Sequence, residues 1–460
     1  MPYVFNKYYP YRSVAFFLGE GFLIFFTMLS VHWVFMGTPI MWMEMAECIQ
    51  RALLVTVIFQ ICLYFFDLYE LRDDLSMPDT ATKITQAFGV GCITLGALYY
   101  FLPVTVIPTR IFWTGFLVVY TAILIWRSCY YYTLKRRLFV QSILIVGTGR
   151  LANDIARVIE GRYDSPYRIF AFVGSEKPDY NPRRVDVYKN LELLRGRLFE
   201  NKVDRIIVAL DDRRGITPIE LLLNFKLQGI AVEQGISFYE RLTGKIPVEK
   251  VDPSWIIFSD GFTIDRVQAF GKRCFDFGFS LFILVLTWPI FIISALIIKL
   301  DTPGTIFYSH ERVGKGRKTF KILKFRSMVQ DAEENGAVWA ETNDSRTTRF
   351  GRFIRKTRID ELPQLLNVIR GEMSIIGPRP ERPVFVESLK KIIPYYDIRH
   401  DVRPGITGWA QVCYPYGASE EDALHKLEYD LYYMKHMSAS FDVLVIFKTV
   451  KIVLFARGGR

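Results

Sequence analysis

The apolar run FGFSLFILVLTWPIFIISALII fills residues 277–298 and decides how the chain divides. It is long enough to cross a hydrocarbon layer, which takes about 20 helical residues. Trp288-Pro289 interrupts it, and proline kinks a helix because it lacks a backbone donor. Lys272 precedes the run and Lys299 follows it. Because basic flanks stay in the cytoplasm, the run favours a re-entrant helix that enters and leaves on one side. An ordinary span with a proline kink is the alternative.

Four more apolar runs come before it. They cover residues 14–36, 53–66, 84–102 and 111–133. Runs of this length and number predict a four-helix transmembrane bundle in residues 1–138. Arg12 precedes the bundle, and Arg136 and Arg137 follow it. An even number of spans with basic ends places both ends in the cytoplasm. A buried, soluble helical core is the alternative.

Residues 139–251 show a different pattern, in which short apolar runs alternate with helical stretches. The runs cover residues 142–146, 169–173, 204–209 and 230–233, and the helical stretches cover 151–160 and 218–227. This alternation predicts a Rossmann-like domain with a parallel sheet. Residues 252–264 follow as a linker.

The turn GTGRLA at residues 147–152 fits the pattern G-x-G-x-x-A between a strand and a helix. Gly147 and Gly149 could therefore hold a nucleotide phosphate at the helix N-terminus. An acidic residue about 20 positions later would complete the dinucleotide pattern, but Glu176 comes later than that. A structural or oligomerising turn is the alternative.

Composition restricts the class of partner. The formal net charge is +11, and 51% of residues are hydrophobic. A basic balance indicates an anionic partner, and the apolar runs favour a membrane surface or a phosphorylated ligand, with no nucleic acid. The six cysteines form no CxxC pair and the five histidines form no ligand pair, so a zinc site is not expected.

The segment RKTRIDELPQLLN covers residues 355–367 and contains a pair of carboxylates. Proline is tolerated in the first helical turn, so Pro363 places Asp360 and Glu361 near a helix N-terminus. The helix dipole and the nearby Arg355 favour a charged carboxylate there. An ionised aspartate is a competent nucleophile for phosphorus. A capped helix with a solvated charged face is the alternative.

Two basic segments accompany this pair. In KILKFR, residues 321–326, Lys324 and Arg326 share one face of a strand because side chains alternate. In GPRPE, residues 377–381, Pro378 and Pro380 restrict the backbone around Arg379. A fixed guanidinium suits bidentate recognition of phosphate.

At these residues the chain resembles the bacterial sugar transferases, the monotopic phosphoglycosyl transferases. The resemblance runs from Lys272 to Arg460 on four blocks: KFRSM at 324–328, RKTRIDELPQL at 355–365, GPRPERP at 377–383 and RPGITGWAQV at 403–412. The whole chain resembles the large polyprenyl glycosylphosphotransferases of exopolysaccharide synthesis. Residues 414–419 and 448–459 resemble the subgroup found with PEP-CTERM export systems.

The resemblance implies a catalytic α/β domain over residues 265–460 and a two-step reaction at the cytoplasmic face of the bacterial inner membrane. Asp360 would attack a UDP-sugar and release UMP, and polyprenyl phosphate would then take the sugar-phosphate. Glu361 would complete the dyad, and Asp360 would contact Mg²⁺. Lys324, Arg326, Arg355 and the group Pro378, Arg379 and Pro380 would bind substrate. A homodimer is expected. The family usually has a small residue where Trp288 precedes the proline.

Two rival functions remain at this point. A nucleotide-sugar dehydrogenase or epimerase would use NAD at residues 147–152, but no Tyr-x-x-x-Lys follows that domain. A non-enzymatic membrane sensor would leave the blocks around Asp360 and Arg379 unexplained.

Overall fold

The computed structural model describes residues 3–4, 7–8, 11–69, 77–135, 140–162, 165–194, 203–211, 218–263, 265–329, 346–415, 417 and 419–455. The chain divides into two compact units. One comprises Met1–Pro2 and Tyr8–Gly235, and the other comprises Tyr3–Lys7 and Ile236–Arg460. Two short strands, β1 (Tyr3–Val4) and β2 (Lys7–Tyr8), stand at the N-terminus. Arg136, Arg137, Tyr416, Ala418 and residues 456–459, used in the sequence analysis, lie outside the described residues.

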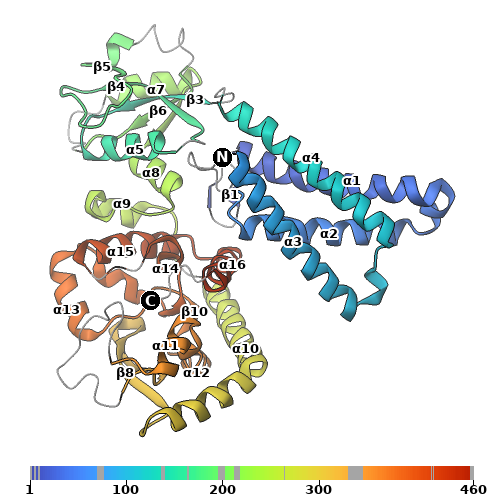
Figure 1. Cartoon of the computed structure of the whole chain (residues 1–460). Helices are drawn as coiled ribbons and strands as arrows, with labels where there is room; N and C mark the ends of the chain where they lie inside the picture. Colours follow the sequence, from blue (N-terminus) through green and yellow to red (C-terminus); the bar gives the residue numbers. More distant parts are fainter. Residues whose placement is uncertain are drawn as a thin grey trace. The chain divides into compact units, whose positions relative to one another are not determined.

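The first unit begins with a helical region, as the apolar runs predict (Figure 1). Its long helices are α1 (Tyr11–Met43), α2 (Met45–Phe65), α3 (Met77–Phe101) and α4 (Thr109–Lys135), and the short helix η1 (Pro103–Thr105) joins the last two. Each of the four contains a segment long and apolar enough to cross a membrane. A helical N-terminal region with several apolar helices is therefore confirmed, whereas the crossing itself stays a prediction.

The four helices share one apolar core. Ile24 of α1, Phe59 of α2, Phe88 of α3 and Val119 of α4 belong to the same buried cluster. A buried ion pair crosses this region, because Arg127 Nη2 lies 2.8 Å from Glu20 Oε1. Glu20 of α1 therefore faces α4, and a buried charge of this kind needs such a partner.

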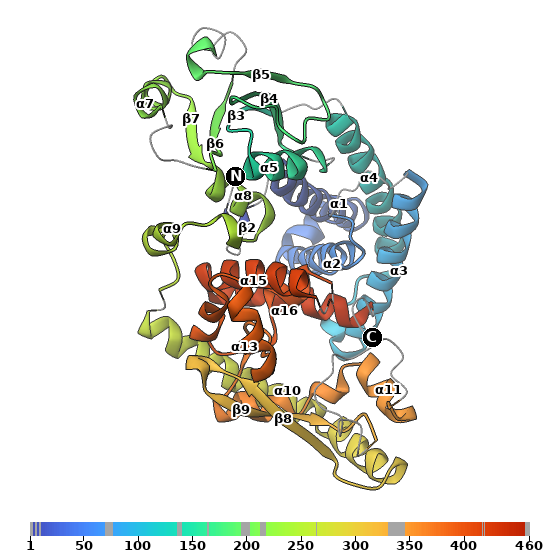
Figure 2. The ribbon, with the colours of Figure 1, turned by 90° about the vertical axis from the view of Figure 1, so that its left-hand side faces the viewer.

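The α/β part of the first unit has a five-stranded, all-parallel sheet (Figure 2). The strand order is β5-β4-β3-β6-β7. The strands are β3 (Gln141–Val146), β4 (Tyr167–Val173), β5 (Asp186–Tyr188), β6 (Arg205–Val208) and β7 (Ala231–Gln234), and the helices are α5 (Arg150–Glu160), η2 (Leu191–Leu194) and α7 (Ile219–Leu227). The predicted Rossmann-like sheet is confirmed. Only β5 was not predicted, because three residues carry too little periodicity.

Side chains on both faces of β3 are buried, which explains why its sequence is a continuous apolar run. Leu144 and Val146 pack in the same cluster as Phe225 of α7. Ile143 and Ile145, which point to the opposite face, are also fully buried. Both faces of the sheet are therefore covered, as is usual for parallel sheets.

The N-terminus of α5 already has an anionic partner within the chain. Asp211 follows β6 and accepts hydrogen bonds from the backbone N–H groups of Arg150 (2.9 Å) and Leu151 (3.4 Å). A Cβ added at Gly149 would lie 2.0 Å from Asp211 Oδ2. Gly149 is therefore required by the close approach of this carboxylate.

The second unit contains the β8–β9 and β10–β11 sheets and, among its described residues, nine α-helices, the first of which is most of α8 (Gly235–Thr243). The strands are β8 (Phe307–Val313) paired antiparallel with β9 (Thr319–Phe325), and β10 (Ser374–Ile376) paired parallel with β11 (Gly405–Thr407). The α-helices that follow Thr243 are α9 (Pro253–Phe258), α10 (Arg266–Asp301), α11 (Arg349–Lys356), α12 (Gln364–Arg370), α13 (Pro383–Ile392), α14 (Trp409–Cys413), α15 (Glu420–Lys435) and α16 (Ala439–Leu454). Short 3-10 turns lie at Val248–Lys250, Lys315–Arg317, Ile359–Glu361 and Tyr396–Asp401.

Residues 236–251, which the sequence analysis grouped with the α/β domain, pack within the second unit. They include most of α8 (Gly235–Thr243). Lys245 Nζ lies 2.7 Å from Glu428 Oε2, and Lys435 Nζ lies 2.8 Å from Glu240 Oε2. Trp409 Nε1 donates to the carbonyl of Gly244 at 2.8 Å. The division between the compact units therefore falls after Gly235.

Helix α10 contains the interrupted apolar run, and Pro289 lies inside it. Figure 1 shows the helix bending between its light green and yellow parts, as expected where a proline removes one backbone hydrogen bond. Its apolar side chains are mostly exposed, among them Phe282 at 61% and Leu296 at 60%. An apolar surface of this extent needs a lipid or protein cover.

Replacing Asp211 with alanine should weaken the α/β domain, because two N–H groups of α5 lose their acceptor. Loss of such a cap typically costs about 1 kcal/mol. Hydrogen exchange of residues 150–160 in the intact chain measures the effect, and Glu176→Ala, an exposed change in the same domain, is the control. Exchange equal to wild type in Asp211→Ala would show that this carboxylate does not hold the helix.

Candidate active site

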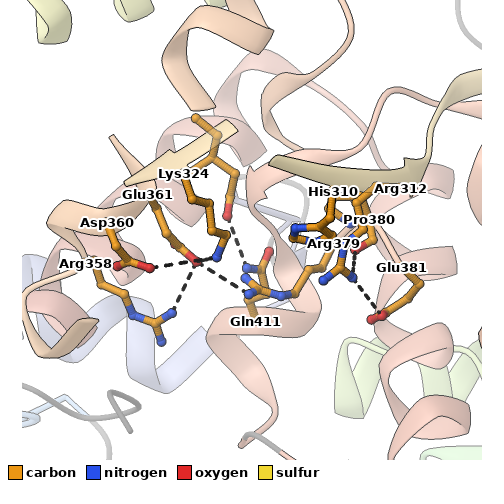
Figure 3. Close-up of polar contacts among 11 residues, drawn as sticks. His310, Arg312, Lys324, Arg358, Asp360, Glu361, Arg379, Pro380, Glu381 and Gln411 are labelled. Atoms are coloured by element: carbon orange, nitrogen blue, oxygen red, sulfur yellow. Dashed lines mark hydrogen bonds and ion pairs between the residues drawn. The ribbon is translucent and has the colours of Figure 1, made fainter. Parts of the chain in front are cut away.

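The β8–β9 hairpin brings basic residues onto one face. In this antiparallel pair Lys324 lies opposite Tyr308, and Ile322 lies opposite His310. Directly opposite residues share a face of the sheet, and every second residue along a strand does too. Lys324, His310 and Arg312 therefore point to the same side, as Figure 3 shows.

A buried asparagine fixes this hairpin against the turn that carries the carboxylates. Asn367 lies on α12 and is completely buried. Its amide nitrogen donates to the carbonyl of Lys321 (2.8 Å), and its amide oxygen accepts from the N–H of Leu323 (3.0 Å). The same nitrogen donates to Glu372 Oε2 at 2.7 Å. The two bonds to β9 hold this strand, and hence Lys324, in a fixed position relative to α12, and the bond to Glu372 fixes the amide itself.

Asp360 and Glu361 lie in the 3-10 turn Ile359–Glu361, directly before Pro363 and α12. Arg358, which begins this turn, has a left-handed backbone with φ of 60°. Such a conformation is unfavourable for a residue other than glycine and persists only where the surroundings hold it. The predicted placement of both carboxylates near the N-terminus of a helix is thus what the structure shows.

Glu361 is surrounded by cations. Its Oε1 accepts from Lys324 Nζ at 3.0 Å and lies 3.5 Å from Arg379 Nη2 and 3.6 Å from Arg358 Nη1 (Figure 3). Lys324 Nζ also lies 3.9 Å from Asp360 Oδ2. Lys324 therefore lies beside both carboxylates, and the charges of Lys324, Arg379 and Arg358 converge on one oxygen of Glu361.

The two carboxylates respond differently to this setting. Burial raises the pKa of Asp360 from 3.8 to about 6, although Lys324 opposes the change. Burial also disfavours ionised Glu361, but Lys324, Arg379 and Arg358 outweigh it and lower the pKa of that group. Glu361 is therefore ionised at all pH values near neutrality. Asp360 gains or loses its proton near pH 6. Arg358 and Arg355 lower the pKa of Asp360, in the direction that the sequence predicts, but desolvation is the larger effect and raises it.

Asp360 Oδ1 is buried and has no hydrogen-bond partner among the described residues. A buried carboxylate oxygen without a partner is costly, and a hard cation would satisfy it. Mg²⁺ usually takes one or two carboxylates and fills its other positions with phosphate oxygens and water. No group of three or more His, Cys, Asp or Glu side chains gathers in the described part of the chain. Asp360 Oδ1 therefore fits the one protein carboxylate of a hard cation such as Mg²⁺, whose remaining positions other oxygen ligands would fill.

Arg379 is held in place by three carbonyl contacts of its own loop. The carbonyl of Pro378 accepts from the N–H of Gly405 (2.9 Å), and that of Pro380 accepts from Arg312 Nη1 (2.9 Å). The carbonyl of Arg379 itself accepts from Arg399 Nη2 at 3.0 Å. The prolines bind through their backbone, so they frame the guanidinium rather than contact the carboxylates.

A buried ion pair of Arg399 and Asp430 supports the loop that carries Arg379. Arg399 Nη2 lies 2.8 Å from Asp430 Oδ2, and both side chains are almost inaccessible to solvent. Arg399 Nη1 also donates to the hydroxyl of Tyr396 (2.7 Å). This pair acts on the site through the backbone of Arg379, so its role is positional.

Arg326 lies away from the carboxylates. Its guanidinium donates to the carbonyls of Thr302 (2.7 Å) and Pro303 (2.7 Å), where α10 ends. The prediction that Arg326 shares a phosphate-binding face with Lys324 assumed a strand that continues to residue 326, but β9 ends at Phe325. Arg355 donates to Thr347 Oγ1 at 3.1 Å, and its charge contributes to lowering the pKa of Asp360 against the larger effect of burial.

Sequence reasoning did not assign His310, Arg312 or Gln411 to the site. Pairing residues 307–313 with 319–325 across a glycine-containing turn would have placed the first two on the face of Lys324. Gln411 lies within the block 403–412, and its Nε2 donates to the carbonyl of Ile406 at 3.2 Å. No local pattern shows that its Oε1 would be buried without a partner among the described residues.

Comparison with known proteins identifies the family. Residues 267–456 match the family model described as bacterial sugar transferase. A UDP-galactose-lipid carrier transferase from Erwinia amylovora is 32% identical over 345 residues, which cover 70% of this chain and 69% of that protein. The chain belongs to the bacterial sugar transferase family.

Other relatives of this bacterial sugar transferase carry related names. A UDP-N-acetylgalactosamine-undecaprenyl-phosphate N-acetylgalactosaminephosphotransferase from Aeromonas hydrophila is 43% identical over 221 residues, 48% of this chain. An undecaprenyl-phosphate glucose phosphotransferase from Komagataeibacter xylinus is 32% identical over 333 residues, 71% of this chain. The matches span 52% and 61% of these two proteins' own lengths.

The glycine-rich turn at residues 147–152 lies in a segment that matches a second family model. Residues 64–217 match the family model of a CoA-binding domain. In the structure the carboxylate of Asp211 takes the N–H groups next to Gly149 that a phosphate would use. A nucleotide at Gly147 and Gly149 stays a prediction, and a ligand there would have to displace that carboxylate.

Asp360→Asn should stabilise the bacterial sugar transferase above pH 6. The folded-state pKa of Asp360 is raised from 3.8 to about 6, so the folded chain binds this proton more tightly than the unfolded chain. The stability of the wild type therefore falls as pH rises from about 4 to about 6, and the amide variant lacks that loss. The difference in melting temperature should grow over this range and then level off. Glu387→Gln, an exposed carboxyl on α13, is the control, and a difference independent of pH would contradict the assignment.

Proposed function

We propose that this bacterial sugar transferase moves a sugar-1-phosphate from a UDP-sugar to undecaprenyl phosphate and releases UMP, as a first step of polysaccharide synthesis. The observation that carries the proposal is the buried Asp360, whose Oδ1 has no described partner while cations surround its neighbour Glu361. The names of the relatives, which contain UDP-sugars and undecaprenyl phosphate, support the choice of substrates. A related exopolysaccharide production protein from Rhizobium supports the pathway class.

In the first step the ionised Asp360 attacks the β-phosphorus of the UDP-sugar. A bond forms between the carboxylate oxygen and phosphorus, and the bond from phosphorus to the bridging oxygen breaks. UMP leaves with that oxygen and the electron pair, so no proton is required. Asp360 then carries the sugar-phosphate as an acyl phosphate.

The surrounding charges reduce the repulsion between an anionic nucleophile and an anionic diphosphate. Lys324 lies next to both carboxylates, and Arg379 and Arg358 add two charges beside Glu361. Charges fixed in advance cost no reorganisation when the reaction occurs. Glu361, kept ionised, orients Lys324 and Arg379 instead of acting as an acid.

In the second step an oxygen of undecaprenyl phosphate attacks the same phosphorus. The bond between phosphorus and Asp360 breaks, and the carboxylate returns to its ionised form. The sugar is then joined to the lipid through a diphosphate. The atoms balance across the two steps, and the enzyme ends unchanged.

A Mg²⁺ ion is part of the proposal. Asp360 Oδ1, buried without a described partner, would hold it. The ion would supply positive charge to the diphosphate oxygens. Lys324 is already paired with Glu361, so this lysine alone cannot neutralise the charge of a diphosphate, and a cation would supply the rest.

The attachment of α10 supports a re-entrant helix on the cytoplasmic face of the inner membrane. At its N-terminal end Lys272 Nζ lies 2.7 Å from Asp442 Oδ2, and Asp276 accepts from the N–H of Ile375 (3.1 Å). At its other end Arg326 donates to the carbonyl of Thr302. Both ends thus contact the same unit, although 36 residues would extend about 54 Å as a straight helix. Attachment of both ends to one unit is what a helix that enters and leaves a membrane on one side requires, and it supports this topology.

The transfer reaction is tested with Asp360→Asn in membranes that contain undecaprenyl phosphate. We expect wild type to release UMP from one of UDP-glucose, UDP-galactose or UDP-N-acetylgalactosamine, and Asp360→Asn to lose this activity, because an amide is a poor nucleophile. Without the lipid acceptor, intact mass spectrometry should show a sugar-phosphate adduct on wild type and none on Asp360→Asn.

Two controls accompany this assay. Glu387→Gln should keep full activity, and EDTA should stop the wild type until Mg²⁺ is restored. Turnover by Asp360→Asn above a few per cent of wild type would exclude the nucleophile, whereas full activity in EDTA would remove the metal alone. Failure of wild type on every UDP-sugar would refute the proposed reaction.

Cysteine labelling tests the topology. Val267→Cys and Leu300→Cys stand at exposed positions near the two ends of α10, in a chain without other cysteines. We expect a reagent that cannot cross the inner membrane to leave both unlabelled when added from the periplasmic side. Val104→Cys, between α3 and α4, should be labelled and is the positive control. Labelling at only one end of α10 would show a straight span.

A further inference from the structure

A histidine beside the carboxylate pair has one ring nitrogen that the chain uses and one that it does not. His310 Nε2 accepts a hydrogen bond from Arg312 Nε at 2.7 Å. Its Nδ1 is buried and has no hydrogen-bond partner among the described residues. A buried polar atom without a partner is costly, so a molecule from outside the chain, a ligand or a water, is needed to complete its hydrogen bond.

The contact with Arg312 fixes which nitrogen carries the proton. An arginine Nε always bears hydrogen and cannot accept, so Nε2 must be the acceptor. The neutral ring then carries its hydrogen on Nδ1. Burial, together with the charges of Arg312, Arg382, Lys324 and Arg379, lowers the pKa of His310 to about 2. The imidazole is therefore a neutral donor throughout the working pH range.

Arg312 is well placed to hold the ring. Besides His310, it donates to the carbonyl of Pro380 (2.9 Å) and lies 3.4 Å from Glu381 Oε2. It thus joins strand β8 to the loop that carries Arg379. Figure 3 shows the imidazole among the basic side chains of Lys324, Arg379 and Arg312.

The neighbours of His310 select the chemistry of its partner. Four cations act on the ring, so an atom that enters this space and accepts a hydrogen bond is favoured if it is negatively charged. His310 and Lys324 share one face of the hairpin, and Lys324 reaches Asp360 and Glu361. An anion beside His310 would therefore lie next to the reacting group.

We propose that His310 Nδ1–H donates a hydrogen bond to a phosphate oxygen of the nucleotide diphosphate, with Arg312 fixing the ring in the required tautomer. This role rests on the proposed function, because it takes the diphosphate of a UDP-sugar as the ligand. A neutral donor binds the phosphate without adding a charge to a site that already contains several. It also releases UMP more readily than another fixed cation would.

Three variants separate the two ring nitrogens. The amide of asparagine can place an N–H near the position of Nδ1, whereas glutamine reaches the position of Nε2 and can accept from Arg312. Phenylalanine keeps the ring shape and neither function. We expect His310→Gln and His310→Phe to lower kcat/KM for UMP release about ten- to a hundredfold, the usual value of one hydrogen bond to a charged group. His310→Asn should remain within about threefold of wild type.

The opposite rescue pattern would overturn the proposal. If His310 only supports Arg312, glutamine should restore activity and asparagine should not. Ser309→Ala, on the other face of β8, is the matched control and should behave as wild type. Unchanged kcat/KM in all three variants would equally exclude a contact with substrate.

Measuring ligand binding tests the contact of His310 without relying on turnover. The affinity of the intact protein for UDP and for uridine is measured with each variant that shows a wild-type melting temperature. A loss of about tenfold or more for UDP in His310→Gln, with uridine unaffected, supports a phosphate contact. Equal losses for both ligands, or none, overturn it. A wild type that binds UDP but transfers no sugar-phosphate would refute the proposed function and leave the contact of His310 to be decided by these affinities.

Discussion

The burial of two adjacent carboxylates is the constraint on which the catalytic unit depends. Asp360 is only 7% exposed, and two negative charges cannot be kept out of water unless cations are fixed beside them. Lys324 provides the shared counter-charge, and Arg379 and Arg358 complete it around Glu361. The result is an unequal pair, in which one carboxylate is a permanent anion and the other keeps a raised pKa and an oxygen available for a ligand.

That unequal pair explains the rigid parts around it. Asn367 locks the strand of Lys324 to the helix that follows the carboxylates. The buried pair of Arg399 and Asp430 fixes the backbone of Arg379. Neither group contacts the carboxylates, yet each sets the position of a cation that does. Preorganisation of this kind is what a phosphoryl transfer site requires, because positioning and electrostatics supply most of the rate.

Features set by local pattern could be predicted from the sequence. The apolar helices, four of the five parallel strands and the turn before Pro363 follow from length, periodicity and turn chemistry. Features set by distant contacts could not. Arg326 turns to the end of α10 because β9 stops one residue earlier, and the pKa of Asp360 depends on burial that no spacing reveals. His310 enters the site only through the pairing of two strands, and residues 236–251 join the second unit through partners such as Glu428, more than 170 positions away.

The carboxylate of Asp211 at the start of α5 is a tethered competitor. It belongs to the same chain, so its effective concentration at the glycine-rich turn is that of an intramolecular ligand, on the order of millimolar. A free nucleotide at micromolar concentration would therefore lose most of its apparent affinity for that turn. The α/β domain can therefore keep a fold suited to phosphates while its glycine-rich turn binds little of any free nucleotide. A phosphate-binding turn can in this way be kept in a protein as a structural element, with a carboxylate of the same chain in the place of the ligand.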